Sequence, residues 1–176
     1  MFGLFKRKPR LLEPSEPIEL KTSIEIDRSA EEIYALLDFG DARNQLRARG
    51  NEVRRISDDP VEYRLWYDRM PDHNFLFTVT EAIPGKSYAY AGQIVPPVGR
   101  RISSHEAYAI EELSEKSCRL TFVNTITHVA GLTEAELADE VGKSSLAAAN
   151  SLTKLKIQAE KGVEAVDEFE REMGQR

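Results

Sequence analysis

The stretch LTEAELADEVGKSSLAAANSLTKLKIQAEKG, residues 132–162, is the longest helical pattern in the chain. Thr133 and Glu136 have the spacing of a capping box, which marks the start of a helix. Steps of three and four residues define one helix face, which consists of Leu137, Val141, Ser145, Ala148, Leu152, Leu155 and Ala159. Large side chains near both ends would anchor this face to a sheet. The small residues of 144–150 would leave room beneath the helix.

The chain before this helix begins with a strand and two short helices. Residues 18–27 alternate between apolar and charged side chains, as a strand with one buried face does. Ser29 repeats the capping-box spacing with Glu32 and predicts a helix over 30–39. Gly40 would end that helix, and Asp41 would cap a second helix over 42–49.

Residues 51–129 alternate between strand-forming segments and short turns rich in Pro, Gly, Asp and Asn. The predicted strands are 51–57, 61–70, 75–82, 87–95, 101–113 and 118–129. Short connections favour antiparallel neighbours. We therefore predict an α+β domain over 18–162, in which a seven-stranded antiparallel sheet curves around the long C-terminal helix.

The two ends of the chain fall outside this predicted domain. Residues 1–17 read as a flexible lead-in, and residues 163–176 as an acidic helical extension or tail. Val163, Val166 and Phe169 form an apolar stripe on that tail. With no core beneath it, the stripe would dock on a second copy of the chain, so the sequence leaves monomer and homodimer open.

Matching bulky residues across the predicted hairpins gives a register and an inner face. One hairpin pairs Tyr67 with Phe75, Leu65 with Phe77 and Tyr63 with Val79, and the next pairs Val79 with Tyr90 and Phe77 with Gly92. The last pairs Ile110 with Leu120, Tyr108 with Phe122 and Glu106 with Asn124. Trp66 then falls on the outer face, where it would cover a sheet edge or join a dimer contact.

Composition excludes several classes of protein. A net charge of −6 argues against nucleic-acid binding. The single cysteine, Cys118, fits a reducing cytoplasm. No segment approaches the roughly 18 apolar residues that a membrane span needs. Residues 1–10 join a short apolar tip to basic residues, which fits either a disordered start or a weak contact with an anionic membrane surface.

The order of elements and three sequence segments resemble the START-like, or Bet v 1-like, superfamily, which includes polyketide cyclases and lipid-transport proteins. The segments are SIEIDRSAEEIYALLDF (23–39), VTEAIPGKSYAY (79–90) and SLTKLKIQAEKG (151–162). The resemblance covers residues 18–162 and implies a helix-grip fold. It also implies an apolar ligand held between the curved sheet and the long helix.

The inner face predicted from the register carries an unusual number of tyrosines. Buried hydroxyls need hydrogen-bond partners, which a ligand cavity would supply. We predict a ligand-binding set of Tyr63, Tyr67, Phe75, Phe77, Tyr88, Tyr90, Glu106, Tyr108, Phe122, Asn124, Ser145, Ala148 and Leu152. The alternative is an ordinary packed core.

Glu106, Asn124 and His128 fall on the same predicted face, together with Ser104. A carboxylate near an amide and an imidazole would suit proton transfer, with Glu106 or His128 as general base. In the alternative reading, Glu106 and His128 lie near strand ends and reach solvent. The sequence leaves open whether the protein is an enzyme, and it favours a binding protein.

Other kinds of site find little support. His73, His105 and His128 lack the spacing of metal ligands, and no Gly-rich phosphate loop or G-x-S-x-G motif is present, so we predict no metal and no cofactor. A local arginine cluster surrounds the second short helix and consists of Arg43, Arg47, Arg49, Arg54 and Arg55. It forms either a solvated face or a contact with an acidic partner or anionic lipid head near the cavity mouth.

The sequence therefore predicts binding or transport of a small hydrophobic molecule, such as a lipid, an isoprenoid or a polyketide-like aromatic. A cyclase or dehydratase of the polyketide type is the first alternative. A stress-response or protein-interaction domain with a filled core is the second.

Overall fold

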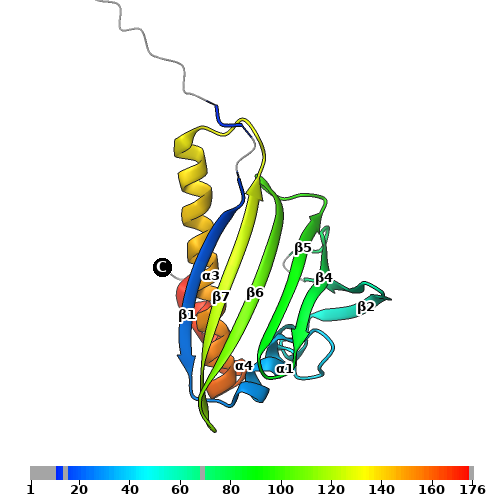
Figure 1. Ribbon diagram of the computed structural model, residues 1–176, viewed down its shortest axis with the longest axis vertical. Helices are drawn as coiled ribbons and strands as arrows, with labels where there is room; N and C mark the ends of the chain where they lie inside the picture. Colours follow the sequence, from blue (N-terminus) through cyan, green and yellow to red (C-terminus); the bar gives the residue numbers. More distant parts are fainter. Residues whose placement is uncertain (1–10, 14–15, 68–69, 175–176) are drawn as a thin grey trace, which may run out of the picture.

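A seven-stranded antiparallel sheet forms the body of the computed structural model, which describes residues 11–13, 16–67 and 70–174. The strands lie in the order β1-β7-β6-β5-β4-β3-β2 (Figure 1). Their bounds are β1 (Ile18–Ile26), β2 (Glu52–Asp58), β3 (Val61–Trp66), β4 (Asn74–Ile83), β5 (Ser87–Val95), β6 (Arg101–Ser114) and β7 (Ser117–His128). Strands β2 to β7 form a meander, and β1 joins it beside β7, so the predicted fold class is confirmed. The basic tip at residues 1–10 lies outside the described residues.

The helices are α1 (Ala30–Leu37), α2 (Gln45–Ala48), α3 (Glu134–Lys161) and α4 (Val163–Gly174). Both predicted capping boxes are present, at the starts of α1 and α3. The second short helix is a single turn and starts later than predicted, because Asn44 and not Asp41 is its N-cap. The buried Asn44 side chain also donates to the carbonyls of Leu36 and Leu37, which fixes its position. Asp41 instead accepts a hydrogen bond from the Arg43 amide.

The acidic tail forms α4, which follows a break in the helix at Gly162 and packs against α3 (Figure 1). Gly162 has a φ of 94°, a conformation that glycine adopts without strain. Val166 of the predicted stripe is fully buried within the chain. The expectation that the stripe has no core beneath it is therefore wrong, and the oligomeric state remains a prediction.

The strand register agrees with the prediction in two hairpins and differs in one. Val79 lies opposite Tyr90, and Glu106 opposite Asn124, as expected. In the β3–β4 hairpin, however, Tyr63 pairs with Phe77 and Leu65 with Phe75, a shift of two residues. The predicted register was wrong because β3 ends at Trp66, so that Tyr67 falls outside the strand. A shift of two residues leaves every side chain on its predicted face.

Trp66 lies on the outer face of the sheet, as predicted. The guanidinium groups of Arg54 and Arg64 each lie 5.4 Å from the centre of its ring. Edge strand β2 provides Arg54, so Trp66 supports the contact between the edge strand and its neighbour.

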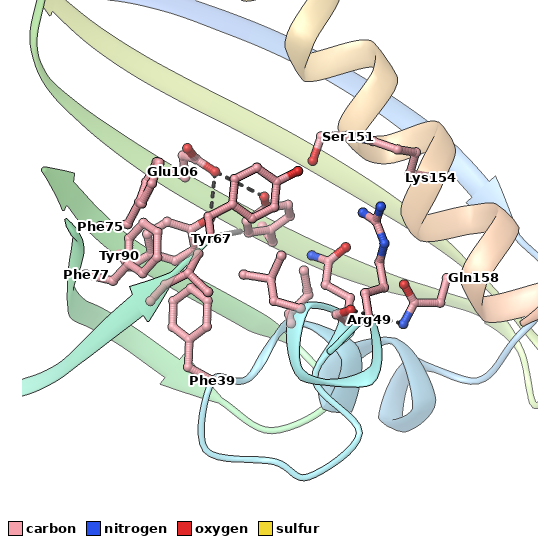
Figure 2. Close-up of a pocket in the computed structure, with 15 residues that line it drawn as sticks. Phe39, Arg49, Tyr67, Phe75, Phe77, Tyr90, Glu106, Ser151, Lys154 and Gln158 are labelled. Atoms are coloured by element: carbon pink, nitrogen blue, oxygen red, sulfur yellow. Dashed lines mark hydrogen bonds between the residues drawn. The ribbon is translucent and has the colours of Figure 1, made fainter. Parts of the chain in front are cut away.

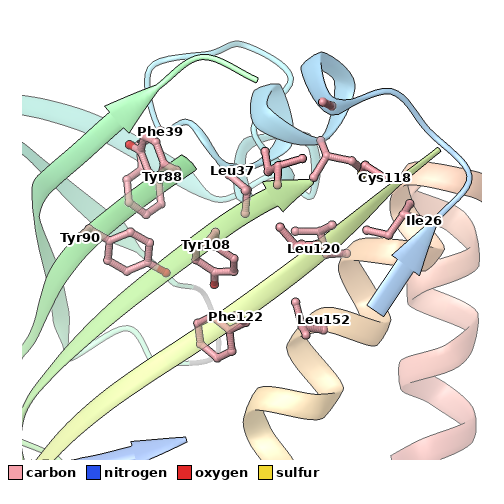
Figure 3. Packing of buried hydrophobic residues seen from close by; sticks show 14 of the residues in the cluster. Ile26, Leu37, Phe39, Tyr88, Tyr90, Tyr108, Cys118, Leu120, Phe122 and Leu152 are labelled. Atoms are coloured by element: carbon pink, nitrogen blue, oxygen red, sulfur yellow. Dashed lines mark hydrogen bonds between the residues drawn. The ribbon is translucent and has the colours of Figure 1, made fainter. Parts of the chain in front are cut away.

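The main core lies on the inner face of the sheet, beneath α1 and the C-terminal half of α3 (Figure 3). Residues of β1, β7 and α3 meet there, among them Ile26, Leu120 and Leu152. All the buried residues of α3 lie in its second half: Ala148, Leu152, Leu155 and Gln158. Leu146, in the first half, is 62% exposed. Within the described residues, no helix has the length and hydrophobicity of a membrane span.

Candidate ligand-binding site

A pocket of about 230 Å³ lies between the inner face of the sheet, the α1–α2 segment and α3 (Figure 2). One part of its lining is aromatic and consists of Phe39, Tyr67, Phe75, Phe77, Tyr90 and Tyr108. The other part is polar and consists of Gln45, Arg49, Ser151, Lys154 and Gln158. We call these parts the aromatic end and the cationic end of the main pocket. The pocket is therefore amphipathic.

The aromatic end is a rigid stack. Phe39 lies parallel to Phe77 with ring centres 4.9 Å apart, and the Tyr90 ring lies 5.0 Å from each of them. Backbone contacts fix Phe39 in place. Its amide donates to the Tyr88 hydroxyl (3.2 Å), and its carbonyl accepts from Nε and Nη2 of Arg47 (3.1 and 2.9 Å). This wall is thus pre-formed to contact a flat or apolar group.

Glu106 supplies the carboxylate of the main pocket. Its Oε2 accepts hydrogen bonds from the hydroxyls of Tyr90 (2.6 Å) and Tyr108 (3.2 Å). Burial and the nearby Glu106 charge raise the pKa of both tyrosines well above the ordinary value of 10. The two phenols therefore stay protonated at neutral pH and hold the carboxylate in one orientation.

A second pocket of about 360 Å³ adjoins the first and shares Glu106 and Ser151 with it. Asn124 lines this second pocket and lies directly opposite Glu106 in the sheet. The Asn124 side-chain oxygen is buried and has no hydrogen-bond partner among the described residues. Since buried polar atoms are usually paired, this oxygen is available to a ligand donor.

The cationic end is built from three elements. Arg49, which follows α2, and Lys154 of α3 both contact the same oxygen of Glu170 on α4, at 2.7 and 3.2 Å. Burial of Glu170 raises its pKa, but the hydrogen bonds from the two cations outweigh that effect and lower the pKa to about 2. Glu170 is therefore ionised at neutral pH.

Most of the residues predicted from the sequence to bind ligand line one of these two pockets. Tyr67, Phe75, Phe77, Tyr90, Glu106 and Tyr108 line the main pocket, and Glu106, Phe122, Asn124 and Ala148 line the second. Tyr63, Tyr88 and Leu152 are buried in the core and line neither pocket. Ser145 is exposed, and its hydroxyl donates to the Val141 carbonyl. The roles of all these residues in ligand binding remain predictions.

His128 does not join Glu106. It lies opposite Arg101, four residues along β7 from Asn124, a distance of about 13 Å at 3.3 Å per residue. It is 1% exposed and lines neither pocket. The expectation that it reaches solvent at the strand end is wrong, because it lies on the buried face of β7. Of the two proposed bases, only Glu106 faces a pocket.

Sequence reasoning missed Phe39, and of the cationic end it gave only Arg49, within a cluster that was placed near the cavity mouth as one of two alternatives. The sequence predicted Phe39 as the last residue of a helix over 30–39, which says nothing about its burial. In the structure α1 ends at Leu37, and Phe39, in the segment that follows, lines the main pocket. Arg49 was singled out only as one of five clustered arginines, which the structure separates. Arg43 pairs with Asp41, Arg54 with Glu52 and Arg55 with Asp58. Among the described residues, no three His, Cys, Asp or Glu side chains are grouped as a metal site would require.

Sequence comparison finds no match to a family model and no significant match to a curated protein. Comparison with solved structures does find similar folds. The di-domain ARO/CYC BexL from the BE-7585A biosynthetic pathway is 17% identical, with a TM-score of 0.66 over 79% of this chain and 45% of BexL. A START superfamily protein from Mycobacterium smegmatis is 14% identical, with a TM-score of 0.55 over 80% of this chain and 97% of that protein.

A third similar structure is DynU16, from the dynemicin biosynthetic locus. It is 11% identical, with a TM-score of 0.60 over 84% of this chain and 49% of DynU16. The chain thus spans about half the length of BexL and of DynU16. At these identities the likeness concerns the fold. Together with the sheet order and the long C-terminal helix, it shows that the chain has the START-like, or Bet v 1-like, helix-grip fold.

Proposed function

We propose that the protein binds or carries a small hydrophobic molecule in the main pocket. The observation that carries the proposal is the aromatic end, where three rings stack around a cavity that the core does not fill. Burial of apolar ligand surface there contributes about 25 cal/mol per Å², before the cost of ordering the ligand. The fold shared with the ARO/CYC protein BexL and with the START superfamily protein supports a hydrophobic ligand, and the class that we propose is a lipid, an isoprenoid or a polyketide-like aromatic.

Blocking the pocket tests this proposal. Ser151 is half-buried on α3 and lines both pockets, so Ser151→Phe places a ring in the shared space. Ala149→Phe adds the same ring to an exposed position of the same helix and is the matched control. A neutral solvent-sensitive dye, titrated by fluorescence, should bind the wild type and the control but not Ser151→Phe. Equal binding by Ser151→Phe, at an unchanged melting temperature, would place the dye elsewhere.

Native mass spectrometry of the protein purified from its own source, followed by organic extraction, would identify the natural ligand class. A clean mass, with no uptake from a mixture of lipids and aromatic polyketides, would instead support the filled-core alternative.

A cyclase- or dehydratase-type reaction is the second candidate, and the position of Glu106 in the main pocket favours it. Glu106→Gln separates the two functions. A carrier keeps most of its affinity for the extracted ligand, whereas an enzyme loses turnover by a factor on the order of 100 or more. His128→Gln serves as the comparison, because this side chain faces neither pocket.

A further inference from the structure

Arg49 at the cationic end has hydrogen-bonding capacity that the protein itself does not use. A guanidinium carries five N–H donors in a fixed fork. Among the described residues, its one ion-pair partner is Glu170, which contacts Nη2. Its Nε is buried without a hydrogen-bond partner. A buried unpaired donor destabilises the folded protein, and an acceptor on a bound ligand would recover that loss.

At the cationic end of the main pocket, the charges of the described residues do not balance. Arg49 and Lys154 line the main pocket, whereas Glu170, which they share, does not. Among the described residues, two positive groups and one carboxylate leave a net charge of +1 at the cationic end of the main pocket. A single negative charge on a ligand would neutralise it, whereas a dianion such as a phosphate monoester would leave an excess of negative charge.

The aromatic end of the main pocket carries a negative group, the carboxylate of Glu106. Figure 2 shows Glu106 beside Phe75 and Tyr90, whereas Arg49, Lys154 and Gln158 gather toward α3. The Glu106 carboxylate would repel an acid group placed at the aromatic end. The pocket thus has a polarity that admits an amphipathic anion in one orientation, with its apolar body on the aromatic stack.

We propose that the ligand is an amphipathic monocarboxylic acid whose carboxylate binds between Arg49 and Lys154. This rests on the proposed function, because it assigns the chemical class of the ligand in the same pocket. Glu170 acts as an internal counter-ion that keeps the two cations in place and competes with the ligand carboxylate for them. One oxygen of the ligand carboxylate accepts from the Nε side of the Arg49 guanidinium, and the other oxygen accepts from the Lys154 ammonium group.

The test compares decanoic acid with decanamide, which has nearly the same shape and no charge. Affinities are measured by isothermal titration calorimetry at pH 7.5 and low salt. The wild type should bind the acid about tenfold or more tightly than the amide, as a charge-assisted fork predicts. In Arg49→Gln, and independently in Lys154→Gln, this ratio should fall toward one while amide affinity is retained.

Two further variants sharpen the result. Glu170→Gln removes the competing carboxylate, so acid affinity should rise by about threefold or more while amide affinity stays constant. Arg43→Gln changes the net charge by the same amount as Arg49→Gln but is exposed and outside the pockets, so the ratio should not change. Melting temperatures confirm that each variant is folded.

The possible failures are distinguishable. Equal affinity of the wild type for acid and amide overturns this inference and leaves the proposed function standing. Equal weakening of both ligands in Arg49→Gln assigns Arg49 a structural role and also overturns the inference. Failure of the wild type to bind either ligand, or the dye described above, counts against the proposed function itself.

Discussion

Two buried regions of the molecule, the α1–α2 segment and the inner face of β7, differ in how their polar groups are satisfied. Asn44, the N-cap of α2, is fully buried and uses both its amide and its carbonyl: it donates to two backbone carbonyls at the end of α1 and accepts from the Leu46 amide. Beneath the first half of α3, the equally enclosed Asn124 leaves its oxygen unpaired. Residue type and burial are nearly the same, so the difference lies in what surrounds the two side chains.

The long helix shows the same division. Its second half provides the buried residues Leu152 and Leu155, whereas its first half exposes Leu146 and stands over the second pocket. The second half thus closes the core and also lines the main pocket with Ser151, Lys154 and Gln158, whereas the first half borders only the second of the two pockets. The comparison teaches that a satisfied interior holds the fold together, while the adjoining unsatisfied surface is where a ligand would gain most.

Leucine-to-alanine changes in the two halves of α3 should produce the largest contrast in stability. Leu155 is 1% exposed, so Leu155→Ala should lower the free energy of unfolding by about 3 kcal/mol through lost burial and a cavity. Leu146→Ala removes the same atoms from a 62% exposed site and should change it by less than about 0.5 kcal/mol. Urea unfolding followed by circular dichroism measures both. Similar losses in the two variants would show that the first half of α3 also packs on the core.

The ion pairs that join α4 to the cationic end should make stability depend on pH. The folded-state pKa of Glu170 is about 2, below its ordinary value of 4.5. A depressed pKa contributes stability that is present above 4.5 and is lost as the pH falls toward 2. Between pH 6 and pH 3 the wild type should therefore lose about 2 kcal/mol that Glu170→Gln does not lose.

The measurement is urea unfolding at a series of pH values. Glu168→Gln, an exposed carboxylate of the same helix, is the control and should follow the wild type. Parallel pH curves for Glu170→Gln and the wild type would mean that apolar packing, such as that of Val166, holds α4 and that Glu170 contributes little.

The sequence predicted the architecture well because each of its signals is local. Each element is specified by a signal within its own segment, without reference to the rest of the chain. These signals are the alternating residues of 18–27, the capping boxes at Ser29 and Thr133, and the hairpin turns. The face of each strand was also predictable, since an error of two residues in the β3–β4 register leaves it unchanged.

The arginine cluster placed positive charge near the cavity mouth as one alternative. The grouping of Arg49 with Lys154 and Glu170 could not be predicted in this way, because three segments distant in sequence build it. Arg49, Lys154 and Glu170 carry no shared spacing, and only the reversal of the chain at Gly162 brings α4 back to α3. The position of Phe39 depends in the same way on tertiary contacts, with Tyr88 and Arg47. Local patterns thus identify elements, whereas the polarity of the pocket follows from their assembly.

Replacing each buried asparagine by leucine tests the comparison between the two regions directly, with a smaller effect. Asn44→Leu removes three hydrogen bonds and strands two buried carbonyls, so it should cost about 1–2 kcal/mol. Asn124→Leu removes an acceptor that was already unpaired, so stability should stay constant or rise by up to about 1 kcal/mol. Urea unfolding gives both values, and ligand titration supplies the second readout. If Asn124 serves the ligand, Asn124→Leu weakens binding of an extracted hydroxyl-bearing ligand while leaving the protein as stable as before. A destabilised Asn124→Leu would instead make Asn124 a structural residue like Asn44.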